Sequence, residues 1–291
     1  MPFVRSSRRL PKMSTIKTVQ SKVFGKLCME IYKSAQEVAD DLSVRTQTDS
    51  RFDDTFRPGH TDFIGATKEQ TFKMLREGYQ PTVDALKQKV KVIASGKRFK
   101  SFNDVVGFTP IVPNAIMGLP NSMVNSSMKQ IKTKVLDVYY DMTVSAGVDS
   151  SDLIKAGQKM LGVILEMEAQ GYRFNLYVCQ TYADSNGCDM LCVRVKSANQ
   201  PFDLKRMSFP VSHTAFFRGI GFDWYSKFPI GTYRAAYGSP IYYLKSQEEI
   251  KSEFKKLFGN GAMYFSAQTI VKQRDSAETY IKGVLENGKV G

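Results

Sequence analysis

The chain has 291 residues, with 41 Lys and Arg against 28 Asp and Glu, so its formal net charge is +13 and its pI is near 9.4. These values exclude an acidic disordered tail protein. The sequence is 42% hydrophobic and 12% aromatic, with 21 Gly and 11 Pro, which excludes a collagen-like, low-complexity or wholly disordered chain. At roughly 100–200 residues per domain, the length predicts one large domain with an appendage, or two domains.

The sequence predicts a cytoplasmic protein that does not associate with a membrane. Its basic N-terminus is not followed by the apolar stretch of a signal peptide. No window approaches the ~18 consecutive apolar residues that a membrane span needs. The four cysteines, Cys28, Cys179, Cys188 and Cys192, are too few for a disulfide framework in a chain of this length and fit a reducing compartment.

Residues 1–29 contain seven basic residues and no acidic one, interleaved with Ser, Thr and Pro. This composition predicts a flexible basic arm, which either contacts nucleic acid through phosphates or is a solvated terminus without a partner. The candidate contact residues in this arm are Arg5, Arg8, Arg9 and Lys12.

Residues 30–106 are expected to form a helical region. Thr67 and Gln70 fit a capping box, and Pro81 fits the first turn of a second helix that runs to Gly96. The far end of this helical hairpin is basic, which is typical either of a phosphate-tracking stripe or of a solvated helix face. The candidate nucleic-acid contacts here are Lys87, Lys91, Lys97, Arg98 and Lys100.

Residues 107–128 are rich in Gly and Pro and are predicted to connect this region to a second domain. From 129 to 291, strand and helix patterns alternate. The connection between the second and third strands is too short for a parallel return, so these two strands are expected to be antiparallel. The predicted strands lie at 134–141, 174–180, 190–195, 241–244 and 262–266. The fold class that follows is α/β: a doubly wound, mostly parallel sheet with one antiparallel edge strand, preceded by a helical region.

Asp141, Thr143 and Ser145 form a D-x-T-x-S pattern directly after the first strand of this domain. Ligands of such sheets bind at the carboxyl ends of the strands, and a carboxylate with two hydroxyls suits a hard cation. The motif and the element order resemble the von Willebrand factor A domain from about residue 129 to the C-terminus. The resemblance implies a metal-ion-dependent adhesion site for a cation such as Mg²⁺, with Thr214 as the Thr of a later loop. The family's Asp after the fourth strand has no match, because residues 244–246 are Leu-Lys-Ser.

Lys245 stands where that Asp is missing and gives two further interpretations of the crevice. Its ammonium pairs with Asp141 directly, or it binds an anion together with the free N–H groups of the helix that starts at Ser246. A third interpretation is that Asp141 and Ser145 only cap local turns.

Other candidate sites carry weaker patterns. His213, beside Thr214, is the only candidate general base near the crevice, and a structural histidine is the competing interpretation. Cys188 and Cys192, with Cys179, form a zinc cluster only with an outside ligand, so plain buried thiols are expected.

The whole chain looks like a family of uncharacterised bacteriophage proteins, on the runs ATKEQTFKMLREGY, DVVGFTPIVPNAIMGLPNSM and DVYYDMTVSAGVDSSDLIKAGQKMLGVILEMEAQGYRFNLYVC. This resemblance implies a phage origin, and hence the host cytoplasm or a virion, without implying a mechanism. We expect a non-catalytic interaction module that holds a protein at the crevice and contacts nucleic acid through its basic N-terminal part. The alternatives are a metal-dependent phosphoryl-transfer enzyme of the nuclease type that uses Asp141, and a virion structural or assembly protein.

Overall fold

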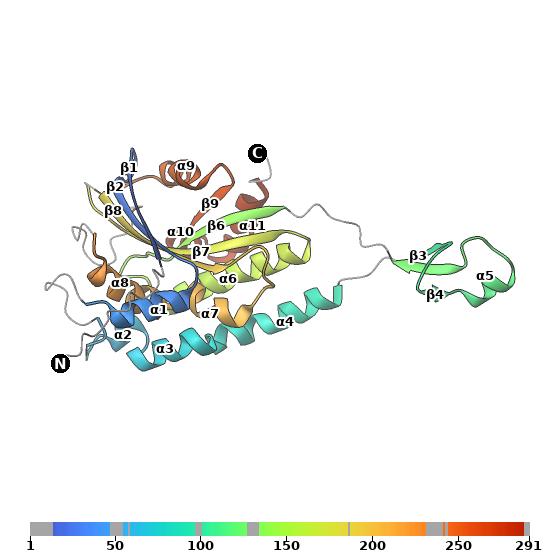
Figure 1. Cartoon of the computed structure of the whole chain (residues 1–291). Coiled ribbons are helices and arrows are strands. Elements are labelled where there is room, and N and C mark those ends of the chain that lie inside the picture. Colours follow the sequence, from blue (N-terminus) through green and yellow to red (C-terminus); the bar gives the residue numbers. More distant parts are fainter. Residues whose placement is uncertain are drawn as a thin grey trace, which may run out of the picture.

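The structure is a computed structural model that describes residues 14–46, 55–57, 59–96, 101–126, 134–185, 187–230, 241 and 244–287 (Figure 1). Its strands are β1 (Ser14–Ser21), β2 (Gly25–Tyr32), β3 (Ser101–Asp104), β4 (Thr109–Pro110), β5 (Met123–Ser126), β6 (Val135–Asp141), β7 (Arg173–Ala183), β8 (Gly187–Lys196) and β9 (Ala262–Ser266). Its helices are α1 (Ala35–Val44), α2 (Thr61–Ile64), α3 (Lys68–Glu77), α4 (Gln80–Gly96), α5 (Val112–Ile116), α6 (Ser150–Ala169), α7 (Leu204–Ser212), the π-helix η1 (Ala215–Gly221), α8 (Phe222–Lys227), α9 (Gln247–Phe258), α10 (Ala267–Gln273), the 3-10 turn η3 (Arg274–Ser276) and α11 (Ala277–Asn287).

Six strands form the main sheet, in the order β1-β2-β8-β7-β6-β9. The pairs β2/β8, β7/β6 and β6/β9 are parallel, and the pairs β1/β2 and β8/β7 are antiparallel. The chain is therefore a mixed α/β protein with a mostly parallel sheet, as the sequence predicts. The predicted antiparallel pairing of the second and third strands is confirmed by β7 and β8. The third predicted strand, β8, lies inside the sheet, however, and the antiparallel edge strand is β1.

The N-terminal strands correct the expected flexible arm. Residues 14–29 lie in β1, in β2 and in the turn between them, so the prediction of a flexible arm over residues 1–29 is wrong for this part. β2 is mostly buried and pairs with β8 from Lys26↔Gly187 to Tyr32↔Val193. β1 covers its outer side and exposes Lys17, and lysine on an edge strand discourages further pairing. The charge that predicts an arm is equally suited to an edge strand.

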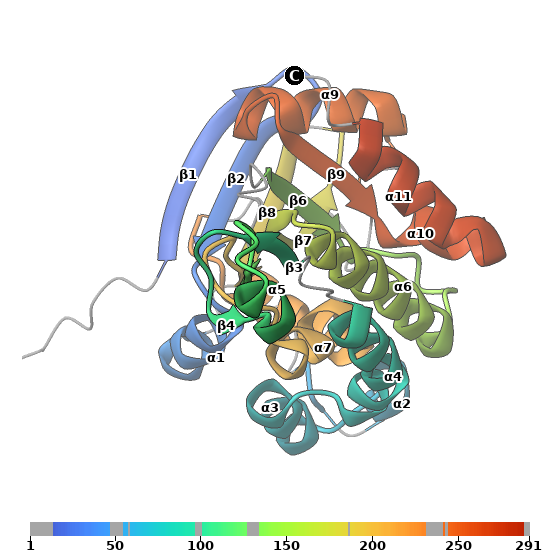
Figure 2. The same cartoon turned by 90° about the vertical axis from the view of Figure 1, so that its right-hand side faces the viewer.

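Helices cover the two faces of the sheet unequally (Figures 1 and 2). One face packs against α1, α6, α7, α8, α10 and α11 around a core that includes Tyr140, Leu161 and Phe216. The other face packs against α9 around Tyr139, Phe254 and Tyr264. The prediction of a sheet with helices on both faces is thus confirmed, with most of the helices on one side. No helix in the described ranges is long and apolar enough to cross a membrane.

The helical hairpin predicted at residues 67–96 is present and forms an outer layer. Thr67 and Gln70 make the expected capping box at the start of α3, and α4 packs on α6 and α7. The Thr82 hydroxyl lies 2.9 Å from that of Ser212 on α7. Beneath this layer, a Cβ added to Gly157 of α6 would lie 2.4 Å from the Val211 carbonyl. A side chain there would force α6 and α7 apart.

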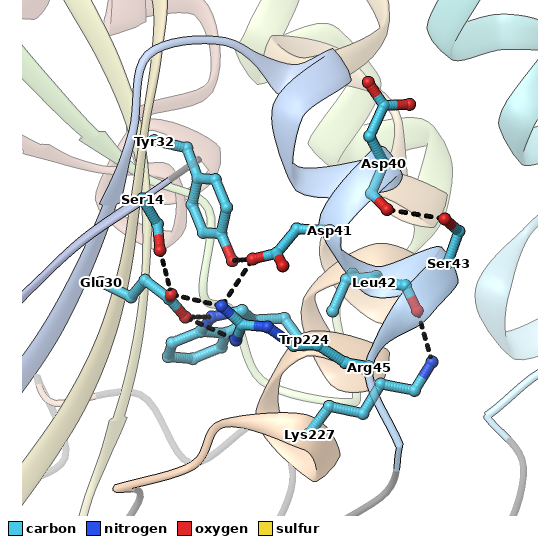
Figure 3. A network of polar contacts seen from close by, with 10 residues as sticks. All are labelled: Ser14, Glu30, Tyr32, Asp40, Asp41, Leu42, Ser43, Arg45, Trp224 and Lys227. Atoms are coloured by element: carbon cyan, nitrogen blue, oxygen red, sulfur yellow. Dashed lines mark hydrogen bonds and ion pairs between the residues drawn. The ribbon is translucent and has the colours of Figure 1, made fainter. Parts of the chain in front are cut away.

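A buried polar network joins the N-terminal strands to helices α1 and α8 (Figure 3). Glu30 is fully buried on β2 and accepts hydrogen bonds from Ser14, Arg45 and the Trp224 indole. Burial alone would raise the pKa of Glu30, but these hydrogen bonds hold it below its usual value. The N-terminal strands are therefore an integral part of the α/β body.

The predicted strand at 241–244 is not formed by the residues that the structure describes there. Ile241 is buried, Leu244 and Lys245 lie in a turn before α9, and residues 242–243 lie outside the described ranges. The predicted strand at 262–266 is confirmed as β9, which pairs with β6 from Asp137↔Ala262 to Asp141↔Ser266.

Candidate functional site

The crevice predicted at the end of β6 contains a closed hydrogen-bond cluster, the Asp141 cluster, made of Asp141, Thr143, Thr181 and Tyr264. One carboxylate oxygen of Asp141 accepts from the Thr143 amide at 2.9 Å. The other accepts from the hydroxyls of Thr181 at 2.7 Å and Tyr264 at 2.9 Å. The Thr143 hydroxyl in turn accepts from the Thr181 amide at 2.8 Å. These bonds connect β6 to its two neighbours, β7 and β9.

The cluster is enclosed, because Asp141 is 1% exposed and Thr143 is completely buried. Burial raises the pKa of Asp141, and the hydrogen bonds from Thr143, Thr181 and Tyr264 offset part of this rise. Burial beside Asp141 likewise raises the pKa of the Tyr264 hydroxyl. A cation ligand needs carboxylate lone pairs that face a cavity, whereas those of Asp141 face protein donors. Within the described ranges, no group of three or more His, Cys, Asp or Glu side chains is placed to hold a metal ion.

Ser145 and Thr214 have partners outside the Asp141 cluster. The Ser145 amide donates to the Gln268 side chain at 3.1 Å, so an amide oxygen just after β9 fastens the D-x-T-x-S loop. The Thr214 hydroxyl donates to the Ile64 carbonyl at 2.9 Å. Of the four residues of the expected metal site, the structure thus brings Asp141 and Thr143 into one cluster, and Thr214 is used to hold the end of α2.

Lys245 and Ser246 lie at the start of α9. The Ser246 hydroxyl accepts from the Glu249 amide, and the Glu249 carboxylate accepts from the Ser246 amide at 2.9 Å. A carboxylate of the chain itself therefore occupies the N-terminus at which an anion was expected. No ion pair within the described part of the chain joins Lys245 to Asp141, whose partners all belong to the Asp141 cluster.

The expected nucleic-acid contacts fall mostly outside the described residues: Arg5, Arg8, Arg9, Lys12, Lys97, Arg98 and Lys100 all do. Lys91 lies on α4. Lys87 is exposed on the same helix and pairs with Asp84 at 3.2 Å. Lys89, its neighbour in the basic stripe, pairs with Glu166 at 2.6 Å. Part of the stripe is thus neutralised by carboxylates of the chain, and its contact with nucleic acid stays a prediction.

His213 and the cysteines are in structural settings. The His213 ring nitrogen accepts from the Ala215 amide at 3.1 Å, and the ring packs edge-on against Tyr79. Burial lowers the pKa of His213 to about 4. All four cysteines are buried and free, and the sulfur atoms of Cys179 and Cys192 lie 3.6 Å apart on paired strands. These positions fit the structural histidine and the buried thiols among the sequence interpretations.

A second feature was not anticipated, and we name it the small-sheet module (residues 101–126). Its strands pair antiparallel in the order β3-β5-β4, and α5 follows β4. It stands apart from the main sheet in Figure 1. Its exposed large apolar side chains have exposed fractions from 46% at Leu119 to 81% at Ile116. They are Val105, Val106, Phe108, Val112, Ile116, Met117 and Leu119.

The Gly and Pro content of residues 107–128 predicts a connector and gives no sign of this surface. A usable signal was present, since residues 105–126 contain no charged side chain in a chain with a net charge of +13. An uncharged run with this many Val, Ile, Phe, Met and Leu is unusual for a solvated linker.

A comparison with known families gives a match over almost the whole chain. Residues 13–289 match the family described as Domain of unknown function (DUF7192). A comparison with curated proteins and with solved structures gives no match.

Proposed function

Because the chain belongs to the DUF7192 family, whose description assigns no activity, we propose its function from its own geometry. It is a non-catalytic interaction protein that associates with further copies of itself through the small-sheet module. The observation that carries this proposal is the set of seven large apolar side chains exposed on a 26-residue segment that contains one charged residue, Asp104. A contiguous exposed apolar patch on a soluble protein marks an interaction site, and we expect these side chains, which crowd into one short segment, to form such a patch.

The charge of the molecule supports a second copy as the partner. Two copies with a net charge of +13 each repel one another over most of their surface. The small-sheet module carries a single carboxylate, so contact between two such modules brings the least like charge together. The module is also too small to bury its own side chains, because three short strands and one turn of helix leave no interior.

The magnitude of burial is sufficient for association. Fully burying one Val, Ile, Leu, Phe or Met side chain contributes about 1.5–3 kcal/mol. Seven such side chains give an upper bound of roughly 10–20 kcal/mol. The loss of translational and rotational freedom costs roughly 4–15 kcal/mol. The two ranges are comparable, which predicts concentration-dependent rather than obligate association.

The α/β body serves as the scaffold in this proposal. We retain the von Willebrand A-like identity for it because the D-x-T-x-S loop follows an interior strand, β6, which is parallel to both of its neighbours, β7 and the edge strand β9. In this scaffold the Asp141 cluster acts as a fastener between strands. The nuclease alternative has less support, since it requires the carboxylate of Asp141 to face a cation and a substrate. Among the alternatives from the sequence, self-association best fits a phage protein with a role in virion assembly, and we include this role in the proposal.

The test is the oligomeric state measured by sedimentation velocity over a wide concentration range. The wild type is expected to associate, and a variant with Val106→Ser, Phe108→Ser and Ile116→Ser is expected to stay monomeric. The matched control replaces exposed apolar residues of the body, Val44→Ser and Val135→Ser, and is expected to associate like the wild type. A wild type that is monomeric at every concentration contradicts the proposal. The proposal is also contradicted if the wild type binds lipid vesicles and only the module variant loses this binding, because a lipid surface is then the partner of the module.

A further inference from the structure

A basic pocket of about 380 Å³ opens at the carboxyl ends of β2 and β8. Because these two strands are parallel, with Tyr32 opposite Val193, the segments that follow them emerge at the same edge of the sheet. α1 begins there at Ser34. This is the position at which open α/β sheets bind ligands, and it lies at the opposite edge from the Asp141 cluster, since β8 is antiparallel to β7.

Three elements bring exposed cations to this pocket: Lys33 follows β2, Arg76 lies on α3 and Arg206 lies on α7. No carboxylate of the residues that the structure describes lines the pocket. Among the described residues, none of these three side chains forms an ion pair. Three unpaired cations from distant parts of the sequence, gathered around one hollow, repel one another unless an anion joins them.

Two further basic residues of the wall have partners of their own. Lys196 is buried and pairs with Glu168 at 2.6 Å, and it donates to the Phe174, Ser197 and Gln200 carbonyls. Arg194 interacts with the Tyr177 hydroxyl, which is neutral and leaves the charge of the guanidinium in place. The charge of Lys196 is thus neutralised by Glu168, whereas Arg194 adds to the charge that Lys33, Arg76 and Arg206 offer a ligand.

The neutral groups of the pocket suit the same class of ligand. Ser34, Gln36 and Gln200 line it. Ser34 and Gln200 carry a hydroxyl and an amide donor, whereas the Gln36 amide donates to Asp40 at 2.7 Å. A second hollow of about 160 Å³ shares Lys196, Gln200 and Arg206 with it, so there is room beyond one anionic group. The single carboxylate of that neighbouring hollow, Asp203, caps α7 by accepting from the Arg206 amide. The two hollows together have the size of a small-molecule site.

We propose that this pocket is a phosphate-binding site, in which Arg76 and Arg206 hold the phosphate oxygens and Lys33 adds charge. Guanidinium groups match phosphate by paired hydrogen bonds, whereas lysine acts as a point charge. The phosphate belongs either to a small phosphorylated molecule or to the phosphodiester backbone of a nucleic acid. The pocket and the small-sheet module share no residue, so this inference stands apart from self-association.

The test is binding of inorganic phosphate to the full chain, followed by calorimetry and by thermal unfolding at constant ionic strength with chloride as the reference anion. The wild type is expected to bind phosphate and to gain thermal stability. The double variant Arg76→Ala/Arg206→Ala is expected to lose at least tenfold in affinity. The control Lys73→Ala/Lys205→Ala removes the same charge from exposed neighbours on the same two helices and is expected to bind like the wild type.

A second titration with a single-stranded oligonucleotide, at low and at physiological salt, distinguishes the sources of the phosphate. Binding of the oligonucleotide that falls steeply with salt, and that the double variant loses, assigns the pocket to a nucleic-acid backbone. Binding of inorganic phosphate alone assigns it to a small phosphorylated ligand. Absence of both, or an equal loss in the double variant and its control, overturns the proposal.

Discussion

The Asp141 cluster and the small-sheet module are opposites in burial and in chemistry. The cluster encloses a carboxylate at 1% exposure among hydroxyl and amide donors, whereas the module exposes Ile116 at 81%. The usual arrangement, with charge outside and apolar groups inside, is reversed in both regions. The reversal at Asp141 is resolved within the chain by hydrogen bonds, while the reversal in the module has no counterpart within the described residues. This difference is the basis of the proposal that a partner covers the apolar side chains of the small-sheet module.

The largest effect that tests this comparison is expected from Asp141→Ala. The substitution leaves the Thr143 amide and the hydroxyls of Thr181 and Tyr264 buried without their acceptor, and each such group costs about 1–3 kcal/mol. We expect the free energy of unfolding, measured with urea, to fall by about 4 kcal/mol. Asp141→Asn keeps the shape and one acceptor oxygen, so its loss is expected to be about half as large.

Thermal unfolding of the wild type and of Asp141→Asn shows whether Asp141 only joins the strands or also binds a cation. If Asp141 acts only within the chain, the midpoint of thermal unfolding is equal in Mg²⁺ and in a chelator for the wild type and for Asp141→Asn alike. A wild type that Mg²⁺ stabilises, beside an Asp141→Asn variant that it does not, would return Asp141 to the metal site that the D-x-T-x-S motif predicts.

Part of the fold and part of the Asp141 cluster could be predicted from the sequence. Local signals predicted the α3–α4 hairpin, through the Thr67 capping box, and the β7–β8 hairpin, through its short connection. The motif placed Asp141 and Thr143 together. It could not supply Thr181 and Tyr264, which reach Asp141 only because β7 and β9 pair with β6. Strand pairing, which no local pattern encodes, thus decides whether the carboxylate of the motif is free for a ligand or is hydrogen-bonded by the chain itself.

The N-terminal strands and the small-sheet module could not be predicted from the sequence for a related reason. β2 becomes a strand by pairing with β8, which lies more than 150 residues further along the chain, and the lysines of β1 and β2, Lys17 and Lys26, are equally compatible with a solvated arm. The module has strand length for only two to four residues per strand, which is below what alternation of apolar and polar residues can reveal. In both cases long-range contacts decide the structure, and composition alone points elsewhere.

A second, smaller effect is the expected dependence of the free energy of unfolding on pH, which arises from the buried side chain of His213. Burial lowers the pKa of His213 to about 4, against 6.5 for a free histidine. The unfolded chain therefore takes up a proton at a higher pH than the folded one, so stability is present above pH 6.5 and is lost as the pH falls toward 4. We expect a loss of about 2 kcal/mol between pH 7 and pH 5.

Urea unfolding of the wild type and of His213→Asn at the two pH values measures this loss. The asparagine oxygen is placed to accept from the Ala215 amide as the ring nitrogen does, and it does not titrate. The variant is therefore expected to show a nearly flat profile. Pairs of equal slope would mean that other groups cause the loss. Glu30 is excluded from this window, because its lowered pKa confines its effect to pH values below its usual 4.5.

The smallest effect is expected where the comparison predicts none. Replacing Val106, Phe108 and Ile116 of the small-sheet module by Ser removes apolar area that the folded monomer does not bury. Surface substitutions of this kind change the free energy of unfolding by about 0.5 kcal/mol or less. Urea unfolding of the triple variant under dilute, monomeric conditions is therefore expected to match that of the wild type. A loss of several kcal/mol would mean that the module packs on the body and that its apolar side chains serve folding rather than a partner. An unchanged stability together with lost association would assign these side chains to the interface between copies, because only the associated state would then depend on their burial.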